Sequence, residues 1–397
     1  MISRKRFLTG FLALLICSFS ISVWAQEDLV RTPAREMILD ASNSFIFVFD
    51  PEKVSSDQVP AVANDLARRH GASVRFHFTT AIRGFSATLP EQAAARMAAE
   101  SPRIAYYEKN GVVWLFDRPV SGKKKPSSPG KGGKGGKEPE PVQVVPYGIE
   151  RVGGPVNVEG QGKTAWVIDT GIDLDHPDLN IGSGINLVWR GKNSANDGHG
   201  HGTHVAGTIA ALDNAIDVVG VAAGAKVEPI RVLDNSGSGT VDRVVAGVDY
   251  VAQQGQAGDC ANLSLGASGH FQSLHEAVYN AAENQGILFA VAAGNDSSDA
   301  NNYEPAHIEH PNVYTVSAVT EIDEFAWFSN WGNPPVDFAA PGMSILSTKK
   351  GGGVTTMSGT SMAAPHVCGI LLLNGSVNQN GFAVNDPDGQ PDPIASR

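Results

Sequence analysis

Residues 359–373 read GTSMAAPHVCGILLL, a run of small residues that leads directly into an apolar helical segment. Because proline is tolerated in a helix only near its first turn, Pro365 predicts that this helix begins close to Ser361. The Ser361 hydroxyl then lies at the positive end of a helix dipole, beside backbone N–H groups that can hold an anion. The helix is apolar nearly all round, which predicts burial in a large core. Ser361 is therefore either a nucleophile, if the chain supplies a base, or an ordinary helix cap.

Composition and charge set the limits for the rest of the chain. The 397 residues are 42% hydrophobic and 18% charged, and this length suggests more than one folded unit. Residues 1–141 carry 20 basic and 14 acidic side chains (20 − 14 = +6), whereas residues 142–397 carry 10 and 27 (10 − 27 = −17). An acidic second part argues against nucleic acid as a partner, because phosphates need a basic face, and suits bound divalent cations.

The N-terminus has the pattern of an export signal. Three basic residues at positions 4–6 precede an apolar run over residues 7–21, and VWA at residues 23–25 is a small-x-small cleavage site. We predict a signal peptide over residues 1–25 and a secreted protein, extracellular or periplasmic. The apolar run is too short to span a bilayer comfortably, and no second candidate span follows, so no membrane contact is expected after signal removal.

Cysteine leaves one question open. Cys17 is lost with the signal, and Cys260 and Cys368 remain in apolar contexts. Export permits a disulfide between them, and two buried thiols fit the pattern equally well.

Residues 43–116 have the pattern of a small α+β domain. The order strand, helix, strand, strand, helix, strand is the ferredoxin-like arrangement, with the last strand continuing through residues 112–116. The predicted strands cover residues 45–49, 74–78, 84–89 and 104–116, and the helices cover 59–69 and 90–99.

A segment rich in Lys, Gly and Pro follows over residues 117–141. It cannot bury a core, so we predict a flexible linker that proteases can reach; a polyanion-binding patch is the alternative.

From residue 142 to residue 397, short apolar strands alternate with helical patterns. This alternation predicts an α/β fold with a doubly wound, mainly parallel sheet, whose chemistry gathers at the carboxyl ends of the strands. The predicted strands are 164–168, 226–232, 261–265, 287–292 and 313–319, and the helices include 202–212, 241–253 and 274–284.

Three further residues could complete a nucleophilic site around Ser361. Asp169 and Asn295 each follow a predicted strand, and His201 begins an apolar helix. Serine catalysis needs a histidine base, a buried carboxylate that orients it, and fixed donors for the developing negative charge. Taken singly, each of these residues also fits a simpler role. A strand-end Asp or Asn can form a turn, and His201 and His204 could ligate a metal, although no HExxH pattern accompanies them.

Four motifs together resemble the subtilisin-like serine proteases, or subtilases, with features of the proteinase K group. The motifs are VIDTGID (residues 167–173), HGTHVAG (201–207), AAGN (292–295) and GTSMAAPH (359–366), in the order Asp, His, Ser. Residues 43–116 resemble the inhibitory prodomain of the same enzymes, through GFSATL (84–89) and IAYYE (104–108).

The resemblance implies a role for each matching residue. Ser361 is the nucleophile, His201 the base and Asp169 the orienting carboxylate, while Asn295 and the Ser361 backbone N–H form the oxyanion hole. His204 is a structural helix residue. An extended polypeptide substrate is clasped by β-augmentation, and Gly294 lines a pocket that accepts large apolar or aromatic side chains. The residues implied in the clasp are Gly237, Ser238, Gly239, Ser264, Leu265 and Gly266.

Structural calcium is the cofactor that the resemblance implies, because the matching positions offer oxygen ligands. These carboxylates could also be ordinary surface-turn residues. The first site comprises Gln143, Asp178, Leu212, Asn214, Ile216 and Val218. The second comprises the carbonyls of Pro311 and Val313 with the carboxylate of Asp337.

We therefore predict a secreted, monomeric serine endopeptidase of broad specificity, made as a zymogen that is inhibited by its own prodomain and processes itself. The alternatives are a catalytically silent binding protein on the same fold, and a lipase or esterase, whose GxSxG motif does not match residues 359–363. Two features depart from the family. The polar tail over residues 374–397 shows no closing helix, and the long linker obscures the mature start, which Gln143 suggests is near Val142.

Overall fold

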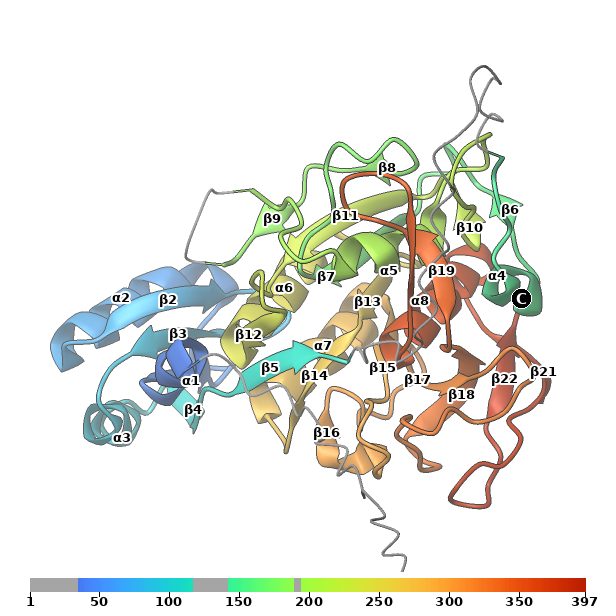
Figure 1. Cartoon of the computed structure of the whole chain (residues 1–397). Helices are drawn as coiled ribbons and strands as arrows, with labels where there is room; N and C mark the ends of the chain where they lie inside the picture. The colour runs from blue at the N-terminus through green and yellow to red at the C-terminus, as the bar shows by residue number, and fades with distance from the viewer. Residues whose placement is uncertain (1–34, 117–141, 189–193) are drawn as a thin grey trace, which may run out of the picture. The chain divides into compact units, whose positions relative to one another are not determined.

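The computed structural model describes residues 35–116, 142–188 and 194–397 (Figure 1). The predicted signal peptide (1–25) and linker (117–141) lie outside the described residues. Within the described part, no helix is both long and apolar enough to cross a membrane.

A ten-stranded sheet organises residues 142–397, and every neighbouring pair in it is parallel except β21–β22. The predicted mainly parallel α/β fold is confirmed. The central strands are continuous apolar runs because helices cover both of their faces. In spatial order the strands are β21 (Asn378–Phe382), β22 (Pro393–Ser396), β18 (Val336–Pro341), β17 (Val313–Val319), β15 (Leu288–Ala292), β13 (Cys260–Leu263), β7 (Thr164–Asp169), β11 (Lys226–Arg231) and β8 (Asn180–Ile181), with β9 (Ile185–Asn186) also paired to β11.

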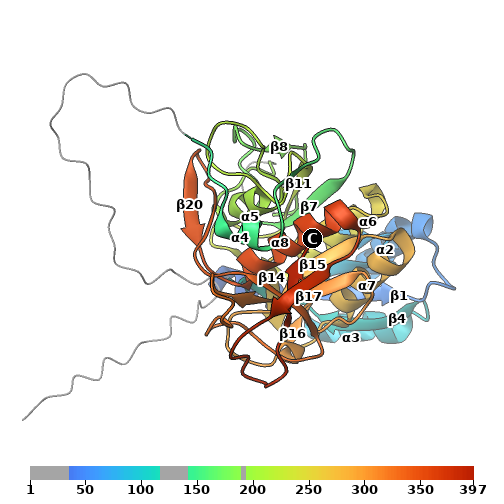
Figure 2. The same cartoon turned by 90° about the vertical axis from the view of Figure 1, so that its right-hand side faces the viewer.

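Two pairs of helices cover this sheet. Figure 2 shows α5 (His201–Ala210) and α8 (Thr360–Asn374) on one side of the strands, with α6 (Val241–Gln254) and α7 (Gln272–Gln285) on the other. Helix α8 is buried from Thr360 to Leu372, as its all-round apolar sequence predicts.

The proline of α8 lies deeper in the helix than expected. The helix begins at Thr360, close to the predicted start, but this places Pro365 in the second turn. Proline has no N–H to donate to the carbonyl four residues earlier, which is that of Ser361. The hydroxyl of Ser264, which directly follows β13, donates to this carbonyl instead, at 2.8 Å. A side chain from outside the helix therefore replaces the missing helical hydrogen bond.

The N-terminal module, defined here as residues 35–116, has its own four-stranded antiparallel sheet in the order β2-β3-β1-β4. This is the predicted ferredoxin-like arrangement, preceded by a helix, α1, that the sequence did not indicate. The core of the module is a cluster of Phe, Val, Leu and Ala side chains between the sheet and its two long helices. Its elements are α1 (Arg35–Ser42), β1 (Ser44–Phe49), α2 (Val59–His70), β2 (Ser73–Phe78), β3 (Gly84–Thr88), α3 (Glu91–Glu100) and β4 (Ile104–Lys109).

One expectation for this module is wrong. Residues 112–116 do not close its sheet, because β4 ends at Lys109 and the chain turns away at Asn110 and Gly111. The strand β5 (Val112–Leu115) instead pairs with β12 (Ser238–Thr240) and β14 (Leu265–Ser268) (Figure 1). An open sheet edge presents unpaired N–H and C=O groups, so a strand can pair with whichever open edge lies within reach.

The two remaining cysteines form a disulfide, Cys260–Cys368, which joins the start of β13 to the middle of α8. The polar tail packs without a closing helix. Strand β22 extends the sheet beside β18, Ile394 is buried, and Asp392 accepts a hydrogen bond from the hydroxyl of Ser317. The tail is therefore held by strand pairing and one buried carboxylate.

The other short elements connect these layers. They are η1 (Ser56–Gln58), α4 (Tyr147–Arg151), β6 (Val156–Asn157), β10 (Ala222–Ala223), η2 (Ala300–Asn302), β16 (Tyr303–Glu304), β19 (Ile345–Thr348) and β20 (Val354–Met357).

Candidate active site

A buried carboxylate and a buried imidazole meet at the carboxyl end of β7. Asp169 is the last residue of β7 and His201 is the first residue of α5, and neither side chain is exposed. The Nδ1 atom of His201 lies 2.9 Å from both carboxylate oxygens of Asp169. The carboxylate therefore holds the ring with Nδ1 protonated, which directs the Nε2 lone pair away from it as a general base requires.

A second buried carboxylate, Asp197, shapes the loop that delivers His201. Its Oδ1 accepts hydrogen bonds from the backbone of His199 and Gly200, and its Oδ2 accepts from the backbone and hydroxyl of Thr203. The hydroxyl of Thr170, next to Asp169, also donates to Asp197. Sequence reasoning missed this residue; the only local signal was an Asp followed by glycine shortly before the histidine motif.

Gly202 shows why the histidine motif needs a small second residue. A Cβ atom at this position would collide with the backbone carbonyl of Gly171 and would lie 3.2 Å from the side chain of Asp169. The first turn of α5 can therefore approach the Asp169 strand end only because residue 202 is glycine.

The hydroxyl of Ser361 faces the carbonyl of Phe116, the last described residue of the N-terminal module. The Ser361 Oγ donates to the Phe116 carbonyl oxygen, and the carbonyl oxygen of Ser264 lies 3.1 Å away as a second acceptor. Ser361 is fully buried at the first turn of α8, so the helix dipole points at this carbonyl group.

The side chain of Asn295 is aimed at the same carbonyl oxygen. Its Nδ2 donates to the Phe116 oxygen at 2.6 Å, while its Oδ1 accepts from the backbone and hydroxyl of Thr360, each at 2.9 Å. These two contacts fix which end of the amide is oxygen, and so fix the N–H donor toward the carbonyl. A preset donor in a buried site is the element that stabilises an oxyanion.

An extended segment of the chain's own N-terminal module lies in the expected clasp. Strand β5 runs antiparallel to β12 on one side and to β14 on the other, with Trp114 opposite both Ser238 and Gly266. The backbone N–H of Leu115 donates to the carbonyl of Gly237 at 3.1 Å. The residues that the structure brings to this segment are Gly237, Ser238, Gly239, Leu265 and Gly266, while Ser264 faces Ser361.

The Phe116 side chain lies in a closed apolar pocket. The residue is 3% exposed, and its ring contacts that of Tyr303 edge to face, with 6.2 Å between centroids. A Cβ atom on Gly266 would collide with the Phe116 ring, so this glycine makes the space that the ring fills. At Gly294, the other glycine expected at this pocket, an added Cβ atom would collide with the side chain of Asn330. The sequence predicts Gly266 in the substrate clasp but does not indicate that it also makes space for the ring.

The first predicted calcium site is assembled from oxygen-bearing groups. The buried carboxylate of Asp178 accepts from the side chain of Asn214 at 2.7 Å and from the backbone of Val218 at 3.3 Å. The Gln143 amide lies 2.6 Å from the Leu212 carbonyl oxygen and 3.2 Å from that of Val218. The amides of Asn214 and Gln143 thus contact one carboxylate and two carbonyl groups. Burial raises the pKa of Asp178 to about 6. This donor set fits a hard cation such as calcium. The sixth residue, Ile216, joins the group through its N–H, which donates to Asn214.

Fewer contacts support the second predicted calcium site than the first. The carboxylate of Asp337 accepts a hydrogen bond from the backbone of Thr315 at 2.8 Å, two residues beyond Val313. No contact that we can describe joins this carboxylate to the carbonyls of Pro311 and Val313, so their joint role stays a prediction.

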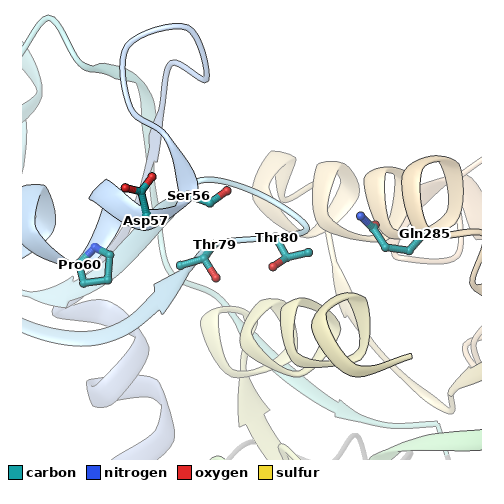
Figure 3. Close-up of a pocket in the computed structure, with 6 residues that line it drawn as sticks. All are labelled: Ser56, Asp57, Pro60, Thr79, Thr80 and Gln285. Carbon is teal, nitrogen blue, oxygen red and sulfur yellow. The ribbon is translucent and has the colours of Figure 1, made fainter. Parts of the chain in front are cut away.

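A separate hollow of about 560 Å³ lies beside the N-terminal module (Figure 3). It is lined by none of the predicted site residues, and most of its wall belongs to the module. The lining residues are Ser56, Asp57, Pro60, Thr79, Thr80 and Gln285.

Comparison with known proteins gives consistent relatives. Residues 160–386 match the subtilase family, peptidase S8. The M-protease of Shouchella clausii (strain KSM-K16) is 42% identical over 235 residues, which is 58% of this chain and 60% of that protein. Subtilisin E of Bacillus subtilis (strain 168) is 35% identical over 319 residues, covering 79% of this chain and 75% of that protein.

Among solved structures, a cold adapted subtilisin-like serine proteinase matches with a TM-score of 0.55 and 36% identity, over 64% of this chain and 98% of that chain. The family match extends over more than half of the 397 residues and includes Asp169, His201, Asn295 and Ser361. This chain belongs to the subtilase family of serine endopeptidases.

Proposed function

We propose that this protein is a secreted serine endopeptidase, made as a zymogen whose N-terminal module inhibits it and is released by self-cleavage after Phe116. The observation that carries the proposal is the position of the Phe116 carbonyl oxygen, which accepts hydrogen bonds from both Asn295 and Ser361. A peptide carbonyl held in this way is in the place of the group that the nucleophile attacks.

The reaction follows from the roles of the four residues. Ser361 Oγ attacks the carbonyl carbon of the scissile bond while His201 takes the hydroxyl proton, and Asp169 stabilises the resulting imidazolium. The negative charge that develops on the carbonyl oxygen is held by Asn295 Nδ2 and the backbone N–H of Ser361. His201 returns the proton to the leaving amine, and water then hydrolyses the acyl-enzyme ester.

The pocket around Phe116 supports a preference for large apolar or aromatic side chains before the scissile bond. Burying a side chain of this size from water contributes about 2–3 kcal/mol. Backbone pairing with β12 and β14 is independent of side-chain identity, which supports broad specificity outside this pocket.

Inhibition by the N-terminal module is supported by its polar anchors on α6. The carboxylate of Asp249 accepts hydrogen bonds from three consecutive backbone N–H groups of the module, those of Thr79, Thr80 and Ala81, at 2.7–3.0 Å. Asp249 is 2% exposed, so these bonds are shielded from water. Three N–H groups that donate to one buried carboxylate bind it strongly, and together they fix the orientation of the module.

Anchors on α7 and at the start of α6 add to this interface. Glu108 accepts from the backbone of Gln272 and Ser273 at the N-terminus of α7, each at 3.0 Å, where the helix dipole favours a negative charge. Arg75 contacts the buried Asp242 at 2.7 Å. The module thus covers helix ends as well as the cleft, as an intramolecular inhibitor should.

The proposed first cut differs from the sequence expectation of a mature start near Val142. A cut after Phe116 leaves residues 117–141 on the enzyme, so a start at Val142 would require a second cut at the end of the predicted linker. We place the first cut after Phe116 because that carbonyl group lies between Asn295 and Ser361.

Calcium belongs to this proposal as a structural ion. It would be held by Asp178, Gln143 and Asn214 together with the carbonyls of the 212–218 loop. The ion would replace the contact between the Asn214 amide and the Asp178 carboxylate, and it would connect this loop to Gln143.

Replacing Phe116 by aspartate tests the position of the cut. We expect self-cleavage to slow about 10²–10³-fold, because the pocket loses a buried ring and gains a charge whose burial costs several kcal/mol. The measurement is intact mass of the full chain against time after refolding. Wild type and the control Phe116→Tyr should yield an enzyme that begins at Asp117 and that a fluorophosphonate labels. A wild-type fragment that ends at another residue contradicts the proposed cut, and an unlabelled enzyme contradicts the proposed activity.

Two buried histidines should make the stability of this enzyme fall at acidic pH. Burial lowers the pKa of His204 to about 3 and that of His366 to about 4, below the value of about 6.5 in an unfolded chain. The unfolded state therefore binds more protons, and each histidine removes about 1.4 kcal/mol per pH unit as the pH falls below 6.5.

The variant His366→Asn isolates this effect, because asparagine can still donate to the Met362 carbonyl that His366 Nδ1 contacts at 2.8 Å, but cannot be protonated. In the inactive Ser361→Ala chain, we expect the loss of unfolding free energy between pH 6.5 and pH 5 to shrink by about 2 kcal/mol. Urea unfolding at the two pH values measures it. An equal loss with and without His366 would show that the ring is protonated in the folded state.

A further inference from the structure

A cluster of histidine and glutamate side chains lies at the far end of the substrate-binding strand β14, away from Asp169 and Ser361. One ligand atom each of His270, Glu304 and His307 lies within 4.8 Å of the other two. His270 follows β14, Glu304 ends β16, which pairs with β14, and His307 lies three residues further on. Neither the catalytic mechanism nor the predicted calcium sites use these residues.

The carboxylate of Glu304 is the part of the cluster that most needs a partner. The residue is fully buried, and among the described residues neither of its carboxylate oxygens has a donor in hydrogen-bond geometry. Leaving a buried carboxylate without such donors is costly in free energy, because its negative charge has lost the water that would solvate it. A bound cation would remove this cost by compensating the charge directly.

The distances suit a small tetrahedral ion. His307 Nδ1 lies 3.2 Å from Glu304 Oε2. Two ligands that are each about 2.0–2.1 Å from a tetrahedral zinc ion lie about 3.3 Å apart, so the spacing of this pair fits one shared ion. To bind it, His307 Nδ1 must give up its 3.3 Å contact with the Tyr303 carbonyl oxygen. The rings of His270 and His307 are 4.3 Å apart between centroids, and one ring nitrogen of His270 lies within 4.8 Å of the ligand atoms of Glu304 and His307.

The surroundings of His307 resemble the outer shell of a metal site. Its Nε2 lies 3.2 Å from Nδ1 of His275, so the ring nitrogen that does not face Glu304 has a hydrogen-bond partner that orients it. His270 is exposed, which gives an ion access from solvent and leaves room for water as a fourth ligand.

We propose that His270, Glu304 and His307 bind one divalent transition-metal ion of the zinc class, with His275 as a positioning residue. Imidazole ligands distinguish this site from the all-oxygen calcium site, because they favour zinc and its neighbours over calcium. The proposal does not depend on the protease activity.

The site would also stabilise one wall of the substrate pocket. Tyr303, which contacts the Phe116 ring, immediately precedes Glu304, and both residues pair with β14. An ion bound at Glu304 therefore holds β16 against the strand that clasps the substrate.

Isothermal titration of the full-length Ser361→Ala chain with zinc, in buffer containing calcium, tests the proposal. This variant keeps the chain intact during the measurement. We expect one zinc ion per chain at the cluster and a rise in melting temperature on binding. His270→Ala, an exposed change that leaves the core intact, and Glu304→Gln, which keeps the side-chain shape, should each weaken binding more than 100-fold. His275→Ala should weaken it about 10–100-fold.

The control is His310→Ala, which removes a nearby histidine that contacts Glu283 and lies outside the cluster. It should bind zinc like the parent chain. Visible absorption of the cobalt-substituted chain should show a tetrahedral site that disappears in His270→Ala. If the parent chain binds no stoichiometric zinc, or if His270→Ala and Glu304→Gln bind it unchanged, for example through His199 and His201, the proposal is wrong.

Discussion

Replacing Ser361 by alanine is expected to lower kcat about 10⁶-fold and to leave the chain uncut. The magnitude is the one found for loss of the nucleophile in subtilisin itself, a relative of this chain. The physical reason is that Ser361 supplies the hydroxyl that contacts the Phe116 carbonyl, whereas Asn295 only donates a hydrogen bond to that oxygen. Catalysis that remains comes from binding and from the oxyanion donor alone.

Hydrolysis of casein and intact mass of the purified protein measure this prediction together. The uncut chain should persist, with the N-terminal module still attached. Ser376→Ala, at an exposed position just beyond α8, is the matched control and should be cut and active like wild type. A Ser361→Ala chain that still digests casein would show that another residue is the nucleophile.

Replacing Asp169 by asparagine should slow self-cleavage about 10⁴-fold with little change in the fold. The Nδ1 atom of His201 has both carboxylate oxygens at 2.9 Å, and an amide in the same place offers an N–H group to the ring. The ring then carries its proton on Nε2, so it cannot take the proton of Ser361, and no carboxylate stabilises the imidazolium.

The rate is measured from the loss of full-length mass after refolding, on a scale extended from minutes to weeks. Asp175→Asn, an exposed change in the same loop, is the control and should process at the wild-type rate. Near wild-type processing by Asp169→Asn would mean that the carboxylate does not set the state of His201.

Much of the fold could be predicted because its signals are local. The strands β7, β15 and β17 are short, mostly apolar runs, and helical patterns with a 3.6-residue period lie between such runs, so the alternation predicts the parallel sheet. The candidate residues Asp169 and Asn295 could be found because strand ends in such a sheet meet at one edge. The helix start near Ser361 could be predicted because Gly359 precedes it and Pro365 is tolerated only near the start of a helix.

The role of β5 could not be predicted in the same way. Its sequence suits any sheet edge and predicts a place in the sheet of the N-terminal module, whereas the strand pairs with β12 and β14. The choice depends on which edges the folded chain leaves open, and that is a property of residues more than one hundred positions away. The same limit hid the contacts of Asp197 and the hydroxyl of Ser264 that replaces the hydrogen bond lost at Pro365.

By itself, then, the sequence determined the fold class and the residue types of the candidate catalytic set, since both depend on periodicity and on motifs a few residues long. Only the tertiary structure decided that Cys260 and Cys368 form a disulfide, that Phe116 occupies the pocket, and that His270, Glu304 and His307 converge. The physical reason is that these features are contacts between distant segments. Their partners are chosen by packing and by the need to satisfy buried polar groups, which no local pattern records.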